Sequence, residues 1–146
     1  MTTHVIADAR RASLAVLLAA VLLGASGCDD ATTATSPTAT SPVTETFSGQ
    51  FTPGGAAARS FVAASAGSVS LTLTQIGPPA DTVVGLGVGI PQASGSGCYL
   101  TQVVQTGAST SPQLTVQVEA GTYCVRLHDP GTLVTQVAFT VTIVRP

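Results

Sequence analysis

His128 is the residue of this 146-residue chain best suited to acid–base chemistry, because an imidazole can act as a general base or as a metal ligand. Asp129 follows it directly, but neighbours on a β-strand point to opposite faces, so the two are not placed as a catalytic dyad. A serine hydrolase also needs an orienting acid, and no G-x-S-x-G sequence marks a nucleophile. Two interpretations of His128 follow: the base of a small hydrolase, or a solvated histidine at the end of a strand.

Metal and nucleotide sites find little support in the sequence. One imidazole cannot complete the tetrahedral ligand set that zinc requires. Asp129 stands before Pro130-Gly131, a pattern typical of an aspartate that begins a turn rather than of a calcium ligand. The run from Gly85 to Gly89 alternates glycine with aliphatic residues, which predicts a strand with one bare face and not a phosphate-binding loop. We therefore predict no metal and no cofactor, and expect a neighbouring segment to pack closely on the bare face.

The N-terminal segment has the features of a signal peptide. Arg10-Arg11 precede an apolar run, Ala12 to Ala25, which is shorter than the roughly 20 residues of a transmembrane helix. The run closes with Leu22-Leu23-Gly24-Ala25-Ser26-Gly27-Cys28, which resembles the lipobox of bacterial lipoproteins. The resemblance implies lipidation of Cys28 and a mature protein held on the bacterial cell envelope by acyl chains, facing the periplasm or the cell exterior. The alternative is an ordinary secretory leader followed by a chance cysteine.

Two further cysteines, Cys98 and Cys124, leave an even number once Cys28 is assigned to the lipid. Disulfides persist in oxidising compartments such as the cell envelope, so we expect these two to pair. Cys124 alternates with Tyr123 and Val125, which places it on the outside of its strand, and the bond should join that exterior to the loop from Gly95 to Cys98. Two separate buried thiols are the alternative.

The chain divides into three parts by composition. Residues 1–27 form the signal peptide, residues 28–44 form a lipidated N-terminus with a disordered linker rich in Thr, Ser and Pro, and residues 45–146 form the folded domain. Beyond the signal peptide the chain contains no lysine and only the arginines at positions 59, 126 and 145. Nucleic acid is a poor partner for so few cations, because binding relies on neutralising phosphates.

Short runs of β-branched residues, separated by Gly and Pro, predict about eight strands in the domain. Apolar side chains alternate with polar ones along most of them, as one buried face of a strand requires. This pattern predicts an all-β domain, a single antiparallel β-sandwich of jelly-roll type. The residues expected to face inward are Phe47, Phe51, Phe61, Ala63, Val69, Leu71, Leu73, Val84, Leu86, Val88, Ile90, Leu114, Val116, Val118, Tyr123, Val125, Leu127, Val137, Phe139, Val141 and Ile143.

Several segments resemble the bacterial pre-peptidase C-terminal domain. They are Arg59-Ser60-Phe61-Val62, the run from Ala66 to Leu73, the run from Ala120 to Leu127, and Phe139-Thr140-Val141-Thr142. The resemblance covers most of the chain from Thr46 to Arg145 and implies a β-sandwich that accompanies secreted enzymes without catalysing a reaction. Some members bind calcium, but a lone Asp81 replaces the acidic cluster of the family.

Together these features predict a lipid-anchored envelope protein whose sandwich is a non-catalytic binding or structural module. Its partners are the membrane, through the lipid, and an envelope polysaccharide or protein. Recognition of a carbohydrate or other polymer is an alternative, for which Tyr99 beside the Gly-Ser loop is the candidate aromatic platform. The alternative of a different class is the small hydrolase that uses His128.

Overall fold

A computed structural model describes residues 41–93, 95 and 97–146. These residues form eight β-strands, and no helix occurs among them. The strands are β1 (Val43–Phe51), β2 (Ala56–Ala63), β3 (Gly67–Gly77), β4 (Val84–Pro91), β5 (Cys98–Thr106), β6 (Leu114–Val118), β7 (Gly121–His128) and β8 (Val137–Arg145).

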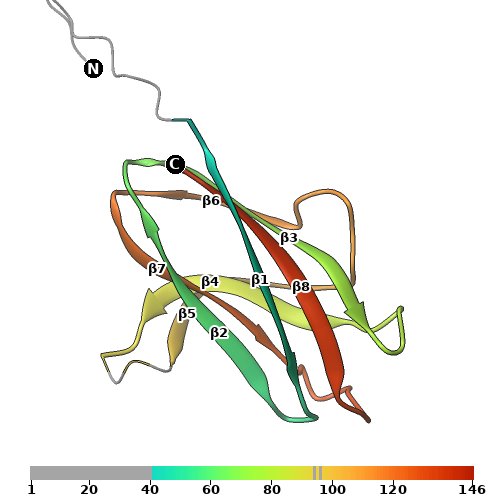
Figure 1. The fold of residues 1–146 in the computed structure, drawn as a ribbon. Coiled ribbons are helices and arrows are strands. Elements are labelled where there is room, and N and C mark those ends of the chain that lie inside the picture. Colours follow the sequence, from blue (N-terminus) through green and yellow to red (C-terminus); the bar gives the residue numbers. More distant parts are fainter. Residues whose placement is uncertain (1–40, 94, 96) are drawn as a thin grey trace, which may run out of the picture. The chain divides into compact units, whose positions relative to one another are not determined.

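The strands form two four-stranded antiparallel sheets packed face to face (Figure 1). Sheet A has the order β1-β8-β3-β6, and sheet B has the order β2-β7-β4-β5. Each consecutive pair of strands except β4–β5 has one member in each sheet, as in a jelly roll of eight strands. The predicted sandwich of jelly-roll type is therefore confirmed, with its predicted number of strands.

The core lies between the sheets and consists of the inward-facing residues of the alternating strands. Val69, Leu71 and Leu73 on β3 are fully buried, and so are Val141 and Ile143 on β8. Three phenylalanine rings join this core at the end of sheet A where β1 finishes, with Phe139 packed against both Phe47 and Phe51. Burial of these apolar faces is the main force that holds the two sheets together.

The sandwich begins earlier than the predicted boundary at Glu45, because β1 already pairs with β8 at Val43 and Arg145. Glu45 then bridges the two sheets. One of its carboxylate oxygens accepts a hydrogen bond from Arg145 Nε on β8 at 2.8 Å, and the other lies 3.8 Å from Arg59 on β2. This cluster lies where the edge strands β1 and β2 of the two sheets meet. Because residues 43 and 44 pair with β8, they belong to the domain and not to the linker.

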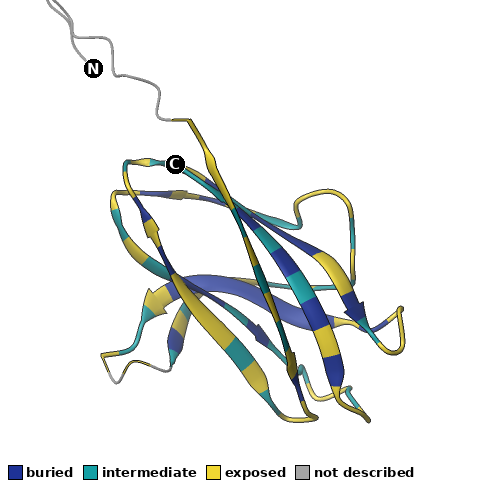
Figure 2. Cartoon of the chain, in the orientation of Figure 1, coloured by how far each residue is buried: buried dark blue, intermediate teal, exposed yellow. Residues whose placement is uncertain are grey.

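Strand β4 is buried on both faces, as its dark colour in Figure 2 shows. Val84, Leu86 and Val88 face the core as predicted. Ile90 does not: 56% of its surface is exposed, and it lies one residue beyond Gly89, the last residue of β4 that pairs with β7. The predicted inward position of Ile90 is therefore wrong, because β4 continues past the end of the buried core.

Candidate functional site

The outer face of sheet B holds His128, the two cysteines and the glycines of β4, which were singled out from the sequence. Three side chains of β7 point outward, and each lies between two small residues of the neighbouring strands. Cys124 is paired with Ser60 and Gly89, Arg126 with Ala58 and Gly87, and His128 with Ala56 and Gly85. Paired residues share a face of a sheet, so these three β7 side chains have small residues on both sides of them.

The bare face of β4 is filled by neighbouring parts of the chain. A Cβ atom on Gly89 would collide with the Tyr99 carbonyl, and one on Gly87 would lie 2.7 Å from the Gln102 carbonyl oxygen and 2.8 Å from Leu100 Cδ2. Strand β5 thus folds partly over the outer side of β4, and only glycine permits so close an approach of two backbones. The prediction of close packing by a neighbouring segment is confirmed.

Cys98 and Cys124 form a disulfide bond, as predicted. The bond connects β7 with β5 across the outer side of β4, so it does not cross the core. Both cysteines are nonetheless buried. The disulfide fixes the end of the loop between β4 and β5 against the outer face of sheet B.

His128 ends β7, but its side chain is half-buried rather than solvated, which corrects that part of the prediction. Its ring lies against Gly85, where a Cβ atom would collide with it. Nδ1 is buried and has no hydrogen-bond partner among the described residues. Burial lowers the pKa of His128, and the positive charge of Arg126 lowers it further, against a smaller opposing effect of Asp129.

Asp129 organises the turn that follows β7. One carboxylate oxygen accepts hydrogen bonds from the N–H groups of Gly131, Thr132 and Leu133, and the other accepts one from Gly54 at 2.8 Å. The Gly54 bond, followed by the other three, lowers the pKa of Asp129 to about 2. The prediction of a turn-forming aspartate is confirmed, and no hydrogen bond joins this carboxylate to His128 within the described part of the chain.

Arg126 lines a shallow groove beside β2. The groove holds a hollow of about 230 Å³ bounded by Ala56, Ala58, Gln92, Gly97 and Arg126. A smaller hollow adjoins it and shares Ala58 and Gly97. Sequence reasoning missed Arg126 as a site residue, although its place between His128 and Cys124 in the alternation of β7 puts all three on one face.

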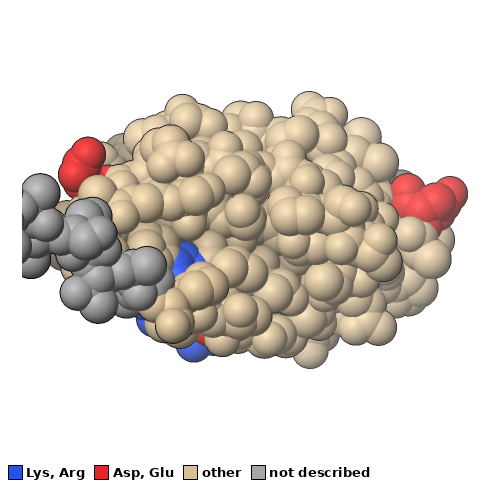
Figure 3. Space-filling view, turned by 90° about the horizontal axis from the view of Figure 1, so that it is seen from above, with Lys and Arg blue, Asp and Glu red and all other residues tan. Residues whose placement is uncertain are grey.

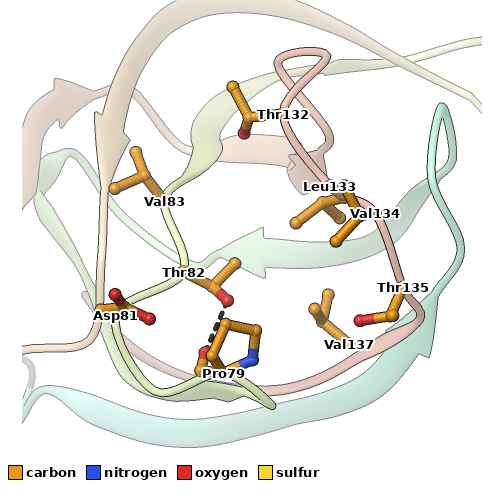
Figure 4. A pocket seen from close by; sticks show the side chains of 9 residues that line it. All are labelled: Pro79, Asp81, Thr82, Val83, Thr132, Leu133, Val134, Thr135 and Val137. Atoms are coloured by element: carbon orange, nitrogen blue, oxygen red, sulfur yellow. Dashed lines mark hydrogen bonds between the residues drawn. The ribbon is translucent and has the colours of Figure 1, made fainter.

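Another hollow, of about 330 Å³, lies between the β3–β4 loop and the β7–β8 loop (Figure 4). Its walls are mainly aliphatic, with Leu133, Val134 and Val137 on one side and Thr82, whose hydroxyl donates to the Pro79 carbonyl, opposite them. Val134 is 87% exposed, and Asp81 is the one charged residue in the lining. The lining is apolar apart from Asp81 and three threonines.

Tyr99, the candidate aromatic platform, is 66% exposed and pairs with the exposed Ile90 on β4. It lines neither the Arg126 groove nor the hollow of Figure 4. Among the described residues, no three His, Cys, Asp or Glu side chains are grouped so as to hold a metal ion. In the same part of the chain no helix has the length and apolar character of a membrane span.

Cys28 and the lipobox lie outside the described residues, as does most of the predicted linker. No model of a protein family matches this chain, and no curated protein sequence matches it. The resemblance to bacterial lipoproteins and to the pre-peptidase C-terminal domain stays a prediction.

Proposed function

We propose that this protein is a lipid-anchored component of the bacterial cell envelope and that its jelly-roll domain is a non-catalytic binding module. Two features of the sequence support the anchor: a short apolar leader and the lipobox ending at Cys28. The linker joins the domain at Val43, the start of β1. The loops that follow β1, β3 and β7 lie at the end of the sandwich away from Val43 (Figure 1).

One observation favours binding over catalysis: the groups suited to covalent or acid–base chemistry are engaged in holding the fold. Four backbone N–H groups bind the Asp129 carboxylate, the cysteines Cys98 and Cys124 are bonded to each other, and the ring of His128 packs on Gly85. A histidine base requires an orienting group on its second ring nitrogen, and Nδ1 of His128 has none among the described residues. The hydrolase alternative gains no support from this arrangement.

The anchor is tested with a Cys28→Ser variant of the full chain in a bacterial host. We expect the wild-type chain to sediment with membranes, and mass spectrometry to find its N-terminal peptide beginning at a diacylated Cys28. The variant should appear in the soluble envelope fraction, because it retains no acyl chain. Unmodified Cys28 in the wild-type chain would contradict the proposal.

The binding role is tested by thermal unfolding of the purified mature chain with calcium and a panel of neutral and acidic envelope polysaccharides. Ligand at 100 times its dissociation constant stabilises the folded state by about 2.7 kcal/mol, which is an easily measured rise in Tm. A saturable rise with one class supports a binding module. No rise with any member of the panel, together with no protein cross-linked to the chain in its own membrane, would count against a binding role.

A further inference from the structure

We propose that Arg126 and the groove beside it bind a carboxylate group of an acidic, uronate-containing polysaccharide. This inference rests on the proposed binding role and names the ligand class of the module.

The first support is that Arg126 differs from the other two arginines of the domain. Arg59 and Arg145 share the carboxylate of Glu45. Arg126 is partly buried, yet no carboxylate of the described residues lies within 4 Å of it, and its guanidinium donates no hydrogen bond to them. Fully buried charges in proteins are almost always paired, so a partly buried guanidinium with no counter-charge among the described residues is a candidate to pair with an anionic ligand.

The nearest acidic residue in the sequence, Asp129, cannot be the counter-charge of Arg126. Its oxygens are held by the N–H groups of Gly54 and of residues 131–133. The charge of Arg126 is instead felt by His128, two residues along the same face of β7, whose pKa it helps to lower. The outer face of β7 is therefore positive and lacks an internal counter-charge among the described residues.

The second support is the shape of the groove. Ala56 and Ala58 form its floor on β2, so an extended ligand can approach the sheet closely beside Arg126. Gln92 and Gly97 form the opposite wall, and the Gln92 side chain folds back over Gly97. The disulfide between Cys98 and Cys124 holds the end of this wall next to β7.

The third support is the chemistry of the surroundings. A guanidinium presents a planar fork of donors that matches a carboxylate, whereas a lone cation is poorly suited to a polyphosphate. The adjoining stretch of the groove offers the Ser60 hydroxyl, and the wall offers the Gln92 amide, both suited to sugar hydroxyls. Figure 3 shows one face of the domain, which carries few charged atoms: acidic atoms lie near its two ends, and a few basic atoms lie near one of them.

The experiment uses isothermal titration of the mature chain with an oligomer of galacturonic acid and with the methyl ester of the same oligomer. In the ester each carboxylate is replaced by an uncharged methyl ester, and the rest of the oligomer is the same. Arg126→Gln removes the proposed anion-binding group. Arg145→Gln is the matched control, because it makes the same change of net charge at an arginine that Glu45 already pairs and that lines neither hollow of the groove. Arg126→Lys keeps the charge but loses the fork.

We expect the acid to bind and the ester to bind at least tenfold more weakly, since hydrogen bonds to charged groups contribute enough for roughly a tenfold change or more. Arg126→Gln should weaken the binding of the acid by a similar factor, Arg126→Lys by less, and Arg145→Gln scarcely at all. Equal loss in Arg126→Gln and Arg145→Gln, or equal binding of acid and ester, would overturn the site while leaving a binding module in place. Binding of neither oligomer would also overturn it, and the wider ligand panel then decides the binding role separately.

Discussion

The two outer faces of the sandwich are built from different residues. On sheet A the outward positions carry Thr and Ser in cross-strand rows, such as Thr46, Thr142 and Thr72, and some hydroxyls bond to one another, as those of Ser70 and Thr115 do at 3.2 Å. On sheet B the outward positions of β2 and β4 are mostly Ala and Gly. Threonine suits a pleated surface exposed to water, whereas glycine weakens a strand unless something must approach it closely.

This difference shows that the outer face of sheet B is adapted to carry other parts of the chain. Sheet B accepts the backbone of β5, the ring of His128 and the disulfide on its outer side, and it leaves Arg126 beside an open groove. Each of these features depends on the small residues around it. Substitutions on sheet B should therefore have larger effects than comparable ones on sheet A.

The largest expected effect follows from removing the disulfide with Cys98→Ala and Cys124→Ala together. The two cysteines are 26 residues apart, and the chain-entropy treatment of such a loop gives a stabilisation of about 3.5 kcal/mol. Chemical denaturation of the double variant and the wild-type chain measures the difference. A loss below about 1 kcal/mol would mean that the loop between β4 and β5 is held by other contacts.

Gly89→Ala should destabilise the domain by about 2–3 kcal/mol, because its Cβ would meet the Tyr99 backbone, which cannot move without shifting β5. Gly85→Ala is the matched comparison. There the added methyl meets only the ring of His128, which can rotate away, so we expect a smaller loss of about 1 kcal/mol. Equal losses for the two variants would contradict the close approach of β5 to β4.

The fold and much of its interior could be predicted from the sequence, because apolar residues alternate over nearly every strand from Phe47 to Ile143. The pairing of Cys98 with Cys124 was also accessible, since only two cysteines remain once Cys28 is assigned to the lipid. The exposure of Ile90 was not, because the alternation of β4 does not show where its pairing with β7 ends. The sequence also does not show that Arg126 has no carboxylate partner among the described residues, since this depends on which carboxylates the fold brings near each arginine.

A smaller effect than those of the disulfide and glycine variants is expected from His128, on the same outer face of sheet B, as a pH dependence of stability. Because the pKa of His128 is lower in the folded protein than its ordinary value of 6.5, the unfolded chain binds the proton more readily. Stability should be constant above about pH 7.5 and fall as the pH drops through 6.5 toward the lower folded-state value. His128→Gln should flatten this part of the curve, measured by denaturation between pH 5 and 8.

Asp129 contributes in a separate, more acidic range. Its pKa falls from 3.8 to about 2 on folding, so its contribution is complete above about pH 5 and is lost as the pH falls toward 2. Asp129→Asn should remove this second dependence while leaving the one near pH 6 in place. A single acid transition that is unchanged in both variants would show that neither group is perturbed by folding.

The smallest effect is expected on sheet A. Thr142→Val keeps the shape of a half-buried side chain whose hydroxyl makes no hydrogen bond to a described side chain, so the free energy of unfolding should change by no more than about 0.5 kcal/mol. Thermal unfolding checks this. A loss of more than 1 kcal/mol would mean that the threonine rows hold sheet A together and that the two faces differ less than their composition indicates.

The most direct test of sheet B as the binding face is an NMR titration of the isotope-labelled mature chain with the galacturonic acid oligomer. Shifted amide signals should concentrate on β2 around Ala56 to Ser60, on the wall at Gln92 and Gly97, and on β7 around Arg126, while the threonine rows of sheet A stay unchanged. Shifts centred on sheet A, or spread evenly over both faces, would contradict the account.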